Sequence, residues 1–104
     1  MTVIEITSKA QYDSIIAEGG LVVVDFHAVW CGPCKMIAPK IKEFSAEFPN
    51  VKFLKVDVDQ LSDIAEEVGI SAMPTLKYYK NGVLIDEVVG ANVMAIRNKI
   101  VQNN

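Results

Sequence analysis

The sequence has very few of the residues that build metal sites and disulfide scaffolds. Its 104 residues include two cysteines and one histidine. Small domains that depend on disulfides or on a structural zinc usually carry four or more such residues. A chain of this length can bury a hydrophobic core without either support. The two cysteines therefore need an explanation other than holding a small fold together.

Long apolar runs and an excess of positive charge are also missing. No apolar segment approaches the roughly 18 residues that a membrane-spanning helix needs. Residues 1–6 lack the basic region and apolar stretch of a secretory signal, so the expected compartment is the cytosol, where thiols stay reduced. With a formal net charge of −3, we expect no binding to nucleic acid or to a membrane. Neither a repeat nor a linker interrupts the chain, which predicts a single domain over residues 1–104.

Short β-branched runs alternate with segments of helical periodicity. The order predicts an α/β fold with a mixed central sheet, in which the early strands are parallel, the C-terminal hairpin is antiparallel and about four helices flank the sheet. The Asn81-Gly82 pair is typical of a type I′ hairpin turn. The expected strands are 3–6, 21–26, 51–58, 75–80 and 83–89.

Capping residues and apolar spacing indicate where the helices begin. Thr7 or Ser8 is the expected cap of the first helix, Asp59 or Ser62 of the third and Asn92 of the last. The helix that follows the cysteines should end before Pro49. The inner face of the last helix is predicted from four apolar residues, Val93, Ile96, Ile100 and Val101.

The Cys-Gly-Pro-Cys stretch at 31–34 has three explanations. A structural zinc site needs four ligands, and one cysteine pair with one histidine falls short. A structural disulfide here would close a very short loop, worth about 2 kcal/mol in the chain-entropy estimate, against about 4.7 kcal/mol for a hundred-residue loop. We therefore favour the third explanation, a redox-active pair.

The spacing of the pair suits reversible disulfide formation. Residues i and i+3 at a helix start have Cβ atoms roughly 5 to 6 Å apart, slightly more than the roughly 3.5 to 4.5 Å of a disulfide. Cys31 should lie at the helix N-terminus, which favours a thiolate by up to about 2 kcal/mol. Cys34 lies one turn further in and should be more shielded. We therefore predict that Cys31 attacks a disulfide and that Cys34 resolves the mixed disulfide.

A lowered thiol pKa by itself contributes little to the rate. A fall from about 8.5 to about 7 raises the thiolate fraction at pH 7 about 16-fold, but each thiolate becomes about 5-fold less nucleophilic, so the net gain is about 3-fold. The larger advantage comes from Cys34, which is held beside the mixed disulfide at a high effective concentration. Loss of Cys34 should therefore trap the intermediate.

Six short motifs follow one another along the chain. They are Val-Val-Asp-Phe at 23–26, Trp-Cys-Gly-Pro-Cys-Lys-Met-Ile at 30–37, Lys-Val-Asp-Val-Asp at 55–59, Met-Pro-Thr at 73–75, Lys-Asn-Gly at 80–82 and Val-Gly-Ala-Asn at 89–92. With these motifs in this order, the sequence resembles the thioredoxin family over essentially its whole length, most closely the eukaryotic cytosolic type. The resemblance implies the thioredoxin fold and a redox-active Cys31–Cys34 disulfide, with no bound cofactor and no metal.

The resemblance also implies a substrate-binding edge. Met73-Pro74 would carry a cis peptide bond that faces the cysteines, and the Met73 backbone would pair with an extended substrate segment. Trp30, Gly90 and Ala91 would form a flat apolar rim. From the residues alone, Pro74 could instead simply begin the following strand.

Asp25 is the residue expected to move protons at this site. It interrupts an otherwise apolar strand, so burial should raise its pKa and suit it to take a proton from Cys34. Lys55 would lie near enough to tune that pKa. The alternative is an ordinary carboxylate at a strand end, bonded to backbone groups.

Two further positions bear on the chemistry. Gly32 and Pro33 set the turn between the cysteines, and Pro33 stands where more oxidising relatives such as disulfide isomerases carry a histidine, so the pair should act as a reductant. His27 stands where thioredoxins usually carry a bulky aromatic residue. It shares a strand face with Asp25 and could titrate near the site, but we favour its packing as an aromatic substitute.

The predicted function is protein disulfide reduction, which keeps cytosolic thiols reduced and donates electrons to reductive enzymes. The resemblance implies recharging by an NADPH-dependent thioredoxin reductase, and substrates such as peroxiredoxins, ribonucleotide reductases and methionine sulfoxide reductases. We expect a monomer in the cytosol, with the nucleus as a further compartment. Two alternatives remain: an oxidant or isomerase, and a binding module or partner subunit in which the thiols are incidental.

Overall fold

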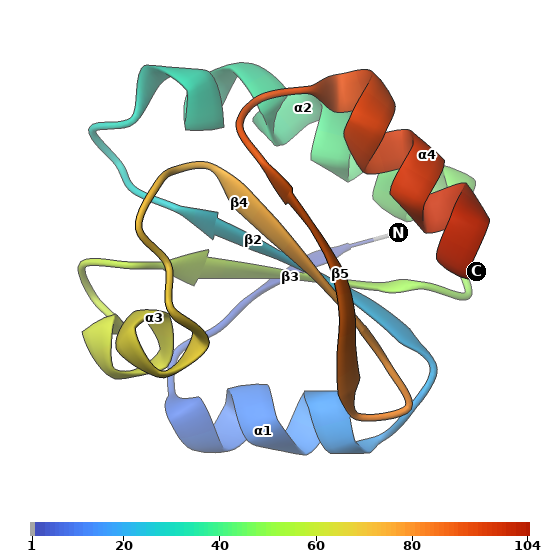
Figure 1. The fold of residues 1–104 in the computed structure, drawn as a ribbon, viewed down its shortest axis with the longest axis horizontal. Helices are drawn as coiled ribbons and strands as arrows, with labels where there is room; N and C mark the ends of the chain where they lie inside the picture. The colour runs from blue at the N-terminus through green and yellow to red at the C-terminus, as the bar shows by residue number, and fades with distance from the viewer. Residues whose placement is uncertain (1) are drawn as a thin grey trace.

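The computed structural model describes residues 2–104, and Met1, the first residue of the predicted domain, lies outside them. The described chain forms a five-stranded mixed sheet with helices on both faces (Figure 1). The order of strands and helices is the predicted one, and the strand bounds differ from the predicted ones by at most one residue. The strands are β1 (Val3–Glu5), β2 (Leu21–His27), β3 (Lys52–Asp57), β4 (Thr75–Lys80) and β5 (Val83–Val89). The helices are α1 (Lys9–Ala17), α2 (Gly32–Glu47), α3 (Ser62–Val68) and α4 (Val93–Asn103).

Strand β2 lies at the centre of the sheet. The strand order is β1-β3-β2-β4-β5, with β1, β3 and β2 parallel and with β4 and β5 antiparallel to their neighbours. Figure 1 shows α2 and α4 on one face of the sheet and α1 and α3 on the other. Every residue of β2 is buried because helices cover both of its faces. The carboxyl end of β2 leads directly into the loop that carries the cysteines, the edge where α/β sheets usually place their chemistry.

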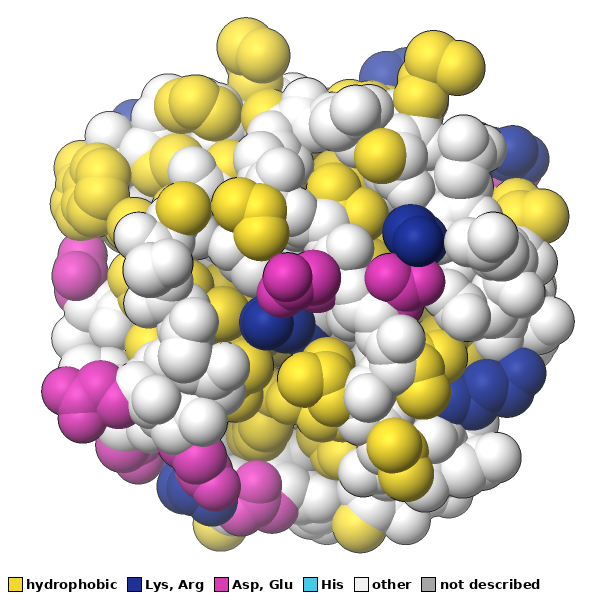
Figure 2. Space-filling model, in the orientation of Figure 1, with side chains coloured by type: hydrophobic (Ala, Val, Ile, Leu, Met, Phe, Trp, Pro, Cys, Tyr) yellow, Lys and Arg dark blue, Asp and Glu magenta, His cyan; other side chains and the backbone are white. Residues whose placement is uncertain are grey.

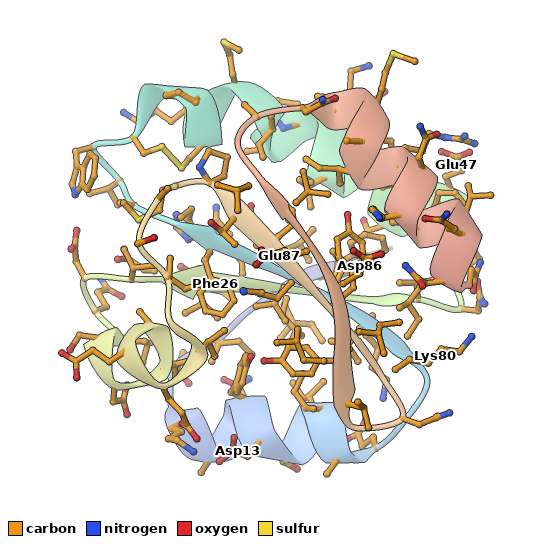
Figure 3. The ribbon with its side chains drawn as sticks, in the orientation of Figure 1. Asp13, Phe26, Glu47, Lys80, Asp86 and Glu87 are labelled. Atoms are coloured by element: carbon orange, nitrogen blue, oxygen red, sulfur yellow. A yellow bond between two sulfur atoms is a disulfide. The ribbon has the colours of Figure 1, made fainter. Side chains whose placement is uncertain are left out.

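The two faces of β2 belong to two separate hydrophobic cores. Phe26 packs in the core beneath α1 and α3, and Figure 3 shows its ring pointing into that layer. Val23 packs in the other core, beneath α2 and α4. Since side chains alternate along a strand, Asp25 and His27 follow Val23 on the face covered by α2. The alternation of β2 therefore directs both polar side chains toward the helix that begins with the cysteines.

The hairpin between β4 and β5 confirms the predicted turn. Asn81 and Gly82 have φ angles of 51° and 84°, and a type I′ turn needs positive φ at both central residues. The Asn81 side chain also accepts a hydrogen bond from the Gly20 N–H at 3.0 Å. This bond ties the hairpin to the residue that precedes β2.

The predicted cap of α3 is wrong. The helix begins at Ser62 and has no hydrogen bond from a capping side chain. Asp57, at the end of β3, instead accepts hydrogen bonds at Oδ1 from the backbone N–H groups of Asp59 and Gln60. The carboxylate that orders this connection therefore belongs to the strand before the turn, and Asp59 is left available for another contact.

Helix α4 begins with its predicted cap but exposes one residue assigned to its inner face. The Asn92 side chain accepts a hydrogen bond from the Ala95 N–H at 3.0 Å. Ile96 and Ile100 are fully buried, whereas Val101 is 52% exposed. Val101 lies about 100° around the helix from Ile100, which turns it away from the sheet.

Candidate active site

Cys31 and Cys34 lie at the start of α2, directly after β2. Cys31 is the N-cap residue and Cys34 lies in the first helical turn, with a Cα–Cα distance of 5.3 Å. A disulfide joins them, visible as a yellow bond in Figure 3. Gly32 and Pro33 are the first two helical residues. Pro33 removes no helical hydrogen bond there, because N–H groups of the first turn have no intrahelical partner.

The N-terminus of α2 places the two sulfur atoms in different surroundings. The Cys34 N–H donates a hydrogen bond to Cys31 Sγ at 3.2 Å. The predicted difference in shielding is wrong, since both cysteines are 4% exposed. Both are buried in one small cluster with Ala28, against which Met73 packs. The asymmetry between the cysteines therefore comes from the helix N-terminus, where N–H groups favour negative charge on Cys31.

The segment before β4 lies against the cysteines. The Met73–Pro74 peptide bond is cis, as the resemblance implies, and Met73 contacts the cluster that contains Cys31 and Cys34. The Gly90 N–H donates a hydrogen bond to the Pro74 carbonyl at 2.8 Å. Gly90 has a φ of 101°, a conformation that side chains disfavour. Met73 therefore packs against the disulfide, and Gly90 is bonded to the residue that follows Met73.

Trp30 presents an aromatic surface beside the cysteines. Its side chain is 65% exposed, and its Nε1–H donates a hydrogen bond to Asp59 Oδ2 at 2.9 Å. Ala91 is half-buried and packs against the core beneath α2 and α4. Sequence patterns did not predict this role of Asp59. A signal was available, because β2 and β3 are parallel and the loops that follow them, which carry Trp30 and Asp59, lie at the same edge of the sheet.

Apolar side chains gather around this edge of the molecule. Figure 2 shows them over the region where Figure 1 places the β2–α2 loop and the start of α2. Val29 is 65% exposed, Met36 72% and Met94 76%. Exposed apolar surface of this kind typically marks a contact with another protein.

Asp25 is 3% exposed, and its Oδ1 has no hydrogen-bond partner within residues 2–104. Burial raises the pKa of Asp25 to about 6, and Lys55, its register neighbour on β3, partly opposes that rise. The free Oδ1 argues against a carboxylate that serves only to bond backbone groups. A pKa near neutrality suits a group that accepts and returns a proton.

A cavity of about 310 Å³ lies beside Cys34. Asp25 and Cys34 both line it, as a proton transfer between them needs. Its other lining residues are His27, Ala28, Val29, Lys35, Ala38 and Lys55.

These features together define a protein that exchanges dithiols and disulfides: a cysteine pair at a helix start, a cis-proline segment against it and a buried carboxyl behind it. The Thioredoxin family model matches residues 3–102. The chain is 52% identical over 101 residues to Thioredoxin-1 of Saccharomyces cerevisiae, which covers 97% of this chain and 98% of that protein. The chain therefore belongs to the thioredoxin family.

Solved structures agree with this assignment. The chain superposes on thioredoxin from Plasmodium falciparum with a TM-score of 0.95 and 47% identity, covering 98% of this chain and 100% of that one. A chain from a structural study of thiol resolution in a yeast mitochondrial 1-Cys peroxiredoxin, via the glutathione and thioredoxin systems, gives a TM-score of 0.93 and 37% identity, covering 97% and 95%. The predicted thioredoxin fold is confirmed.

The protein is a thiol–disulfide oxidoreductase whose redox-active group is the Cys31–Cys34 disulfide. Within residues 2–104, no three His, Cys, Asp or Glu side chains come together as ligands for a metal ion. In the same described part of the chain, no helix is both long enough and apolar enough to span a membrane.

Proposed function

We propose that this protein is a general protein disulfide reductase in which Cys31 attacks and Cys34 resolves. The observation that carries the proposal is the position of Cys31 at the N-terminus of α2, with Cys34 in disulfide contact one turn away. Pro33 keeps positive charge away from the pair, which supports a reductant over an oxidant or isomerase.

In the first step, the Cys31 thiolate attacks one sulfur of a substrate disulfide. A bond forms between Cys31 Sγ and that sulfur, and the other substrate sulfur leaves as a thiolate. The Cys34 N–H, 3.2 Å from Cys31 Sγ, and the positive end of α2 favour the attacking thiolate. The product of this step is a mixed disulfide between the two proteins.

In the second step, Cys34 attacks Cys31 Sγ. The Cys34 proton passes to Asp25 as the new sulfur–sulfur bond forms, and the second substrate sulfur leaves as a thiolate. Two electrons have then moved from the cysteine pair to the substrate. Lys55 opposes the rise in the pKa of Asp25, so that the carboxyl can return its proton to solvent near neutral pH.

The substrate would bind across the exposed edge around the disulfide. The Met73 backbone, next to the cysteines, would pair with an extended substrate segment. The exposed face of Trp30 and the linked Pro74 and Gly90 backbones would form the contact surface, with Ala91 beside them. This recognition depends on backbone and apolar contact, which suits many different substrates.

An NADPH-dependent thioredoxin reductase would return the oxidised pair to the dithiol. Peroxiredoxins are one substrate class, supported by the peroxiredoxin study that contains a structural relative of this chain. Ribonucleotide reductases and methionine sulfoxide reductases would be others. We assign residues 1–104 to one thioredoxin domain that acts as a monomer. It would act in the cytosol and also in the nucleus.

Reduction of insulin, a protein with accessible disulfides, tests this function. The purified protein, NADPH and a thioredoxin reductase should together oxidise NADPH and precipitate the insulin chains. Cys31→Ser is the control and should match the rate without the protein. A wild-type rate equal to that blank would overturn the proposed function.

Trp30→Ala should weaken the binding of protein substrates. Loss of a large exposed aromatic surface at the centre of a contact typically costs more than 1 kcal/mol, so we expect KM for insulin to rise about 10-fold. Reaction with a small aromatic disulfide should change less than about 2-fold, because it needs no extended contact. Trp30→Phe, which keeps a flat ring, is the matched control. An equal loss with both substrates would contradict the assigned role.

A further inference from the structure

His27 is a buried polar residue that the steps above leave unused. It is the single histidine of the chain, and its side chain is 9% exposed. On the face drawn in Figure 2, no histidine surface is visible. Its Nε2 has no hydrogen-bond partner within residues 2–104. An aromatic residue that only packs would need no nitrogen at this place.

Asp25 and His27 turn toward the same cavity. They are separated by one residue on β2 and share its α2 face. Both line the cavity of about 310 Å³ beside Cys34. Asp25 Oδ1 and His27 Nε2 are also the two buried side-chain atoms without a hydrogen-bond partner in residues 2–104. One of these two atoms therefore belongs to the proton acceptor of the proposed reaction, and the other lies on the same cavity.

Water can connect these two atoms. Buried polar groups are almost always hydrogen-bonded, if not to protein then to ordered water. The two atoms make no direct hydrogen bond, and the Cα atoms of residues i and i+2 of a strand lie roughly 6.6 Å apart, a separation that one or two water molecules in series can bridge. The cavity has room for several water molecules. A solvent-bridged connection from Asp25 to His27 is therefore sterically available.

We propose that His27 is a positioning residue that shares, through this solvent, the proton that Asp25 takes from Cys34. The proposal rests on the proposed function, because it concerns the second step of that reaction. The proton leaves Cys34 Sγ as Cys34 attacks Cys31, resides on the Asp25–His27 pair and then passes to bulk water. No further reactant is needed.

The charges around the pair bring the two titrations together. Burial and the Lys55 ammonium lower the pKa of His27, while Asp57 on β3 and Glu5 on β1 oppose this. Burial raises the pKa of Asp25 to about 6. Lys35 on α2 also lines the cavity.

The sign of the coupling between the two groups follows from their charges. Ionised Asp25 favours protonated His27, and protonated His27 favours ionised Asp25. The pKa of Asp25 is raised and that of His27 is lowered, so the two titrations shift toward each other, and groups that interact in this way titrate as a pair. Removal of the carboxylate should therefore lower the pKa of the imidazole, and removal of the imidazole should raise the pKa of the carboxyl.

NMR titration of His27 in the oxidised protein tests the coupling. The cysteines do not titrate in the disulfide form, and the ring signals are unambiguous because the chain has one histidine. Asp25→Asn keeps the shape of the side chain and should lower the pKa of His27 by about 0.5 to 1 unit. The control is Asp13→Asn on α1, across the sheet from α2 (Figure 3), which should leave it unchanged. If the pKa of His27 in Asp25→Asn lies within 0.2 unit of its wild-type value, or above that value, the proposal is overturned.

His27→Phe provides the second measurement. If the pair shares the proton, the pH midpoint for resolution of the mixed disulfide should move upward by about 0.5 unit or more. An unchanged pH profile means that His27 only packs, and it overturns the proposal. The insulin assay on wild type separates this proposal from the proposed function. If insulin is reduced normally but the pKa of His27 does not shift in Asp25→Asn, only the Asp25–His27 pair is rejected. If insulin is not reduced, the disulfide reductase function is rejected.

Discussion

The Cys34→Ser variant is expected to attack substrate disulfides at nearly the wild-type rate and then to stop. The mixed disulfide through Cys31 should accumulate, because serine cannot displace the substrate sulfur. Well-oriented intramolecular groups reach effective concentrations of about 10⁵ M or more, whereas an external thiol is present at about 10⁻³ M. Multiple-turnover reduction should therefore fall by at least about 10³-fold.

Accumulation can be measured by mass spectrometry or on a non-reducing gel after mixing with a protein disulfide. The backbone places Cys34 correctly for this step, since its Cα lies 5.3 Å from that of Cys31, within the usual range for a disulfide. Cys31→Ser is the matched control and should form no mixed disulfide at early times. Turnover by Cys34→Ser within 10-fold of wild type would contradict the assigned roles of the two cysteines.

Asp25→Asn should make the protein more stable at neutral pH and less active. Burial raises the pKa of Asp25 from its ordinary value of 3.8 to about 6, so the folded protein binds this proton more tightly than the unfolded chain. Stability therefore falls as pH rises from about 4 to 6, by about 3 kcal/mol in total, and stays reduced above that range. The neutral amide avoids this loss.

Urea unfolding of the disulfide form at pH 7 and at pH 4 measures the effect. The variant should be more stable than wild type by about 3 kcal/mol at pH 7, and the difference should shrink to about 0.5 kcal/mol at pH 4. Asp13→Asn, at an exposed site on α1, should change stability by less than about 0.5 kcal/mol at either pH. A gain for Asp25→Asn that is the same at both pH values would show that the charge of Asp25 is not its cause.

The kinetic effect of Asp25→Asn should have the opposite sign. Loss of a proton acceptor typically slows a proton-coupled step by about 10²-fold, so release of the mixed disulfide should slow by about this factor near pH 7. Stopped-flow fluorescence of Trp30, which lies beside the cysteines, can follow the step. An unchanged release rate would show that Asp25 does not accept the proton of Cys34, and that its burial only lowers the stability of the folded protein.

Much of the fold follows from signals that act over a few residues. The apolar run around Asp25 indicated a buried strand, and the Asn81-Gly82 pair indicated the hairpin turn. The cap Asn92 marked the start of α4. These features could be predicted because alternation, turn geometry and capping each depend on near neighbours in the chain.

Contacts between distant segments could not be predicted in this way. The helical period of α4 was correct, but the sheet covers a narrower stripe than its apolar residues suggest, so Val101 is exposed. Asp59 looks like a helix cap from its neighbours alone, yet it accepts the Trp30 N–H from a loop 29 residues away. A local pattern indicates which face of an element is apolar, but not what packs against that face.

The sequence by itself determined the reactive group of this protein, because two cysteines at i and i+3 at the start of a helix can form a disulfide whatever the rest of the fold does. It also placed Asp25 and His27 on one face of a strand, since side chains alternate. Only the tertiary structure decided that Met73 packs against the cysteines and that Gly90 bonds to Pro74. It also decided that Asp25 Oδ1 and His27 Nε2 lack protein partners beside Cys34. The physical reason is that burial and hydrogen-bond satisfaction depend on every element that packs around a group, and these come from all parts of the chain.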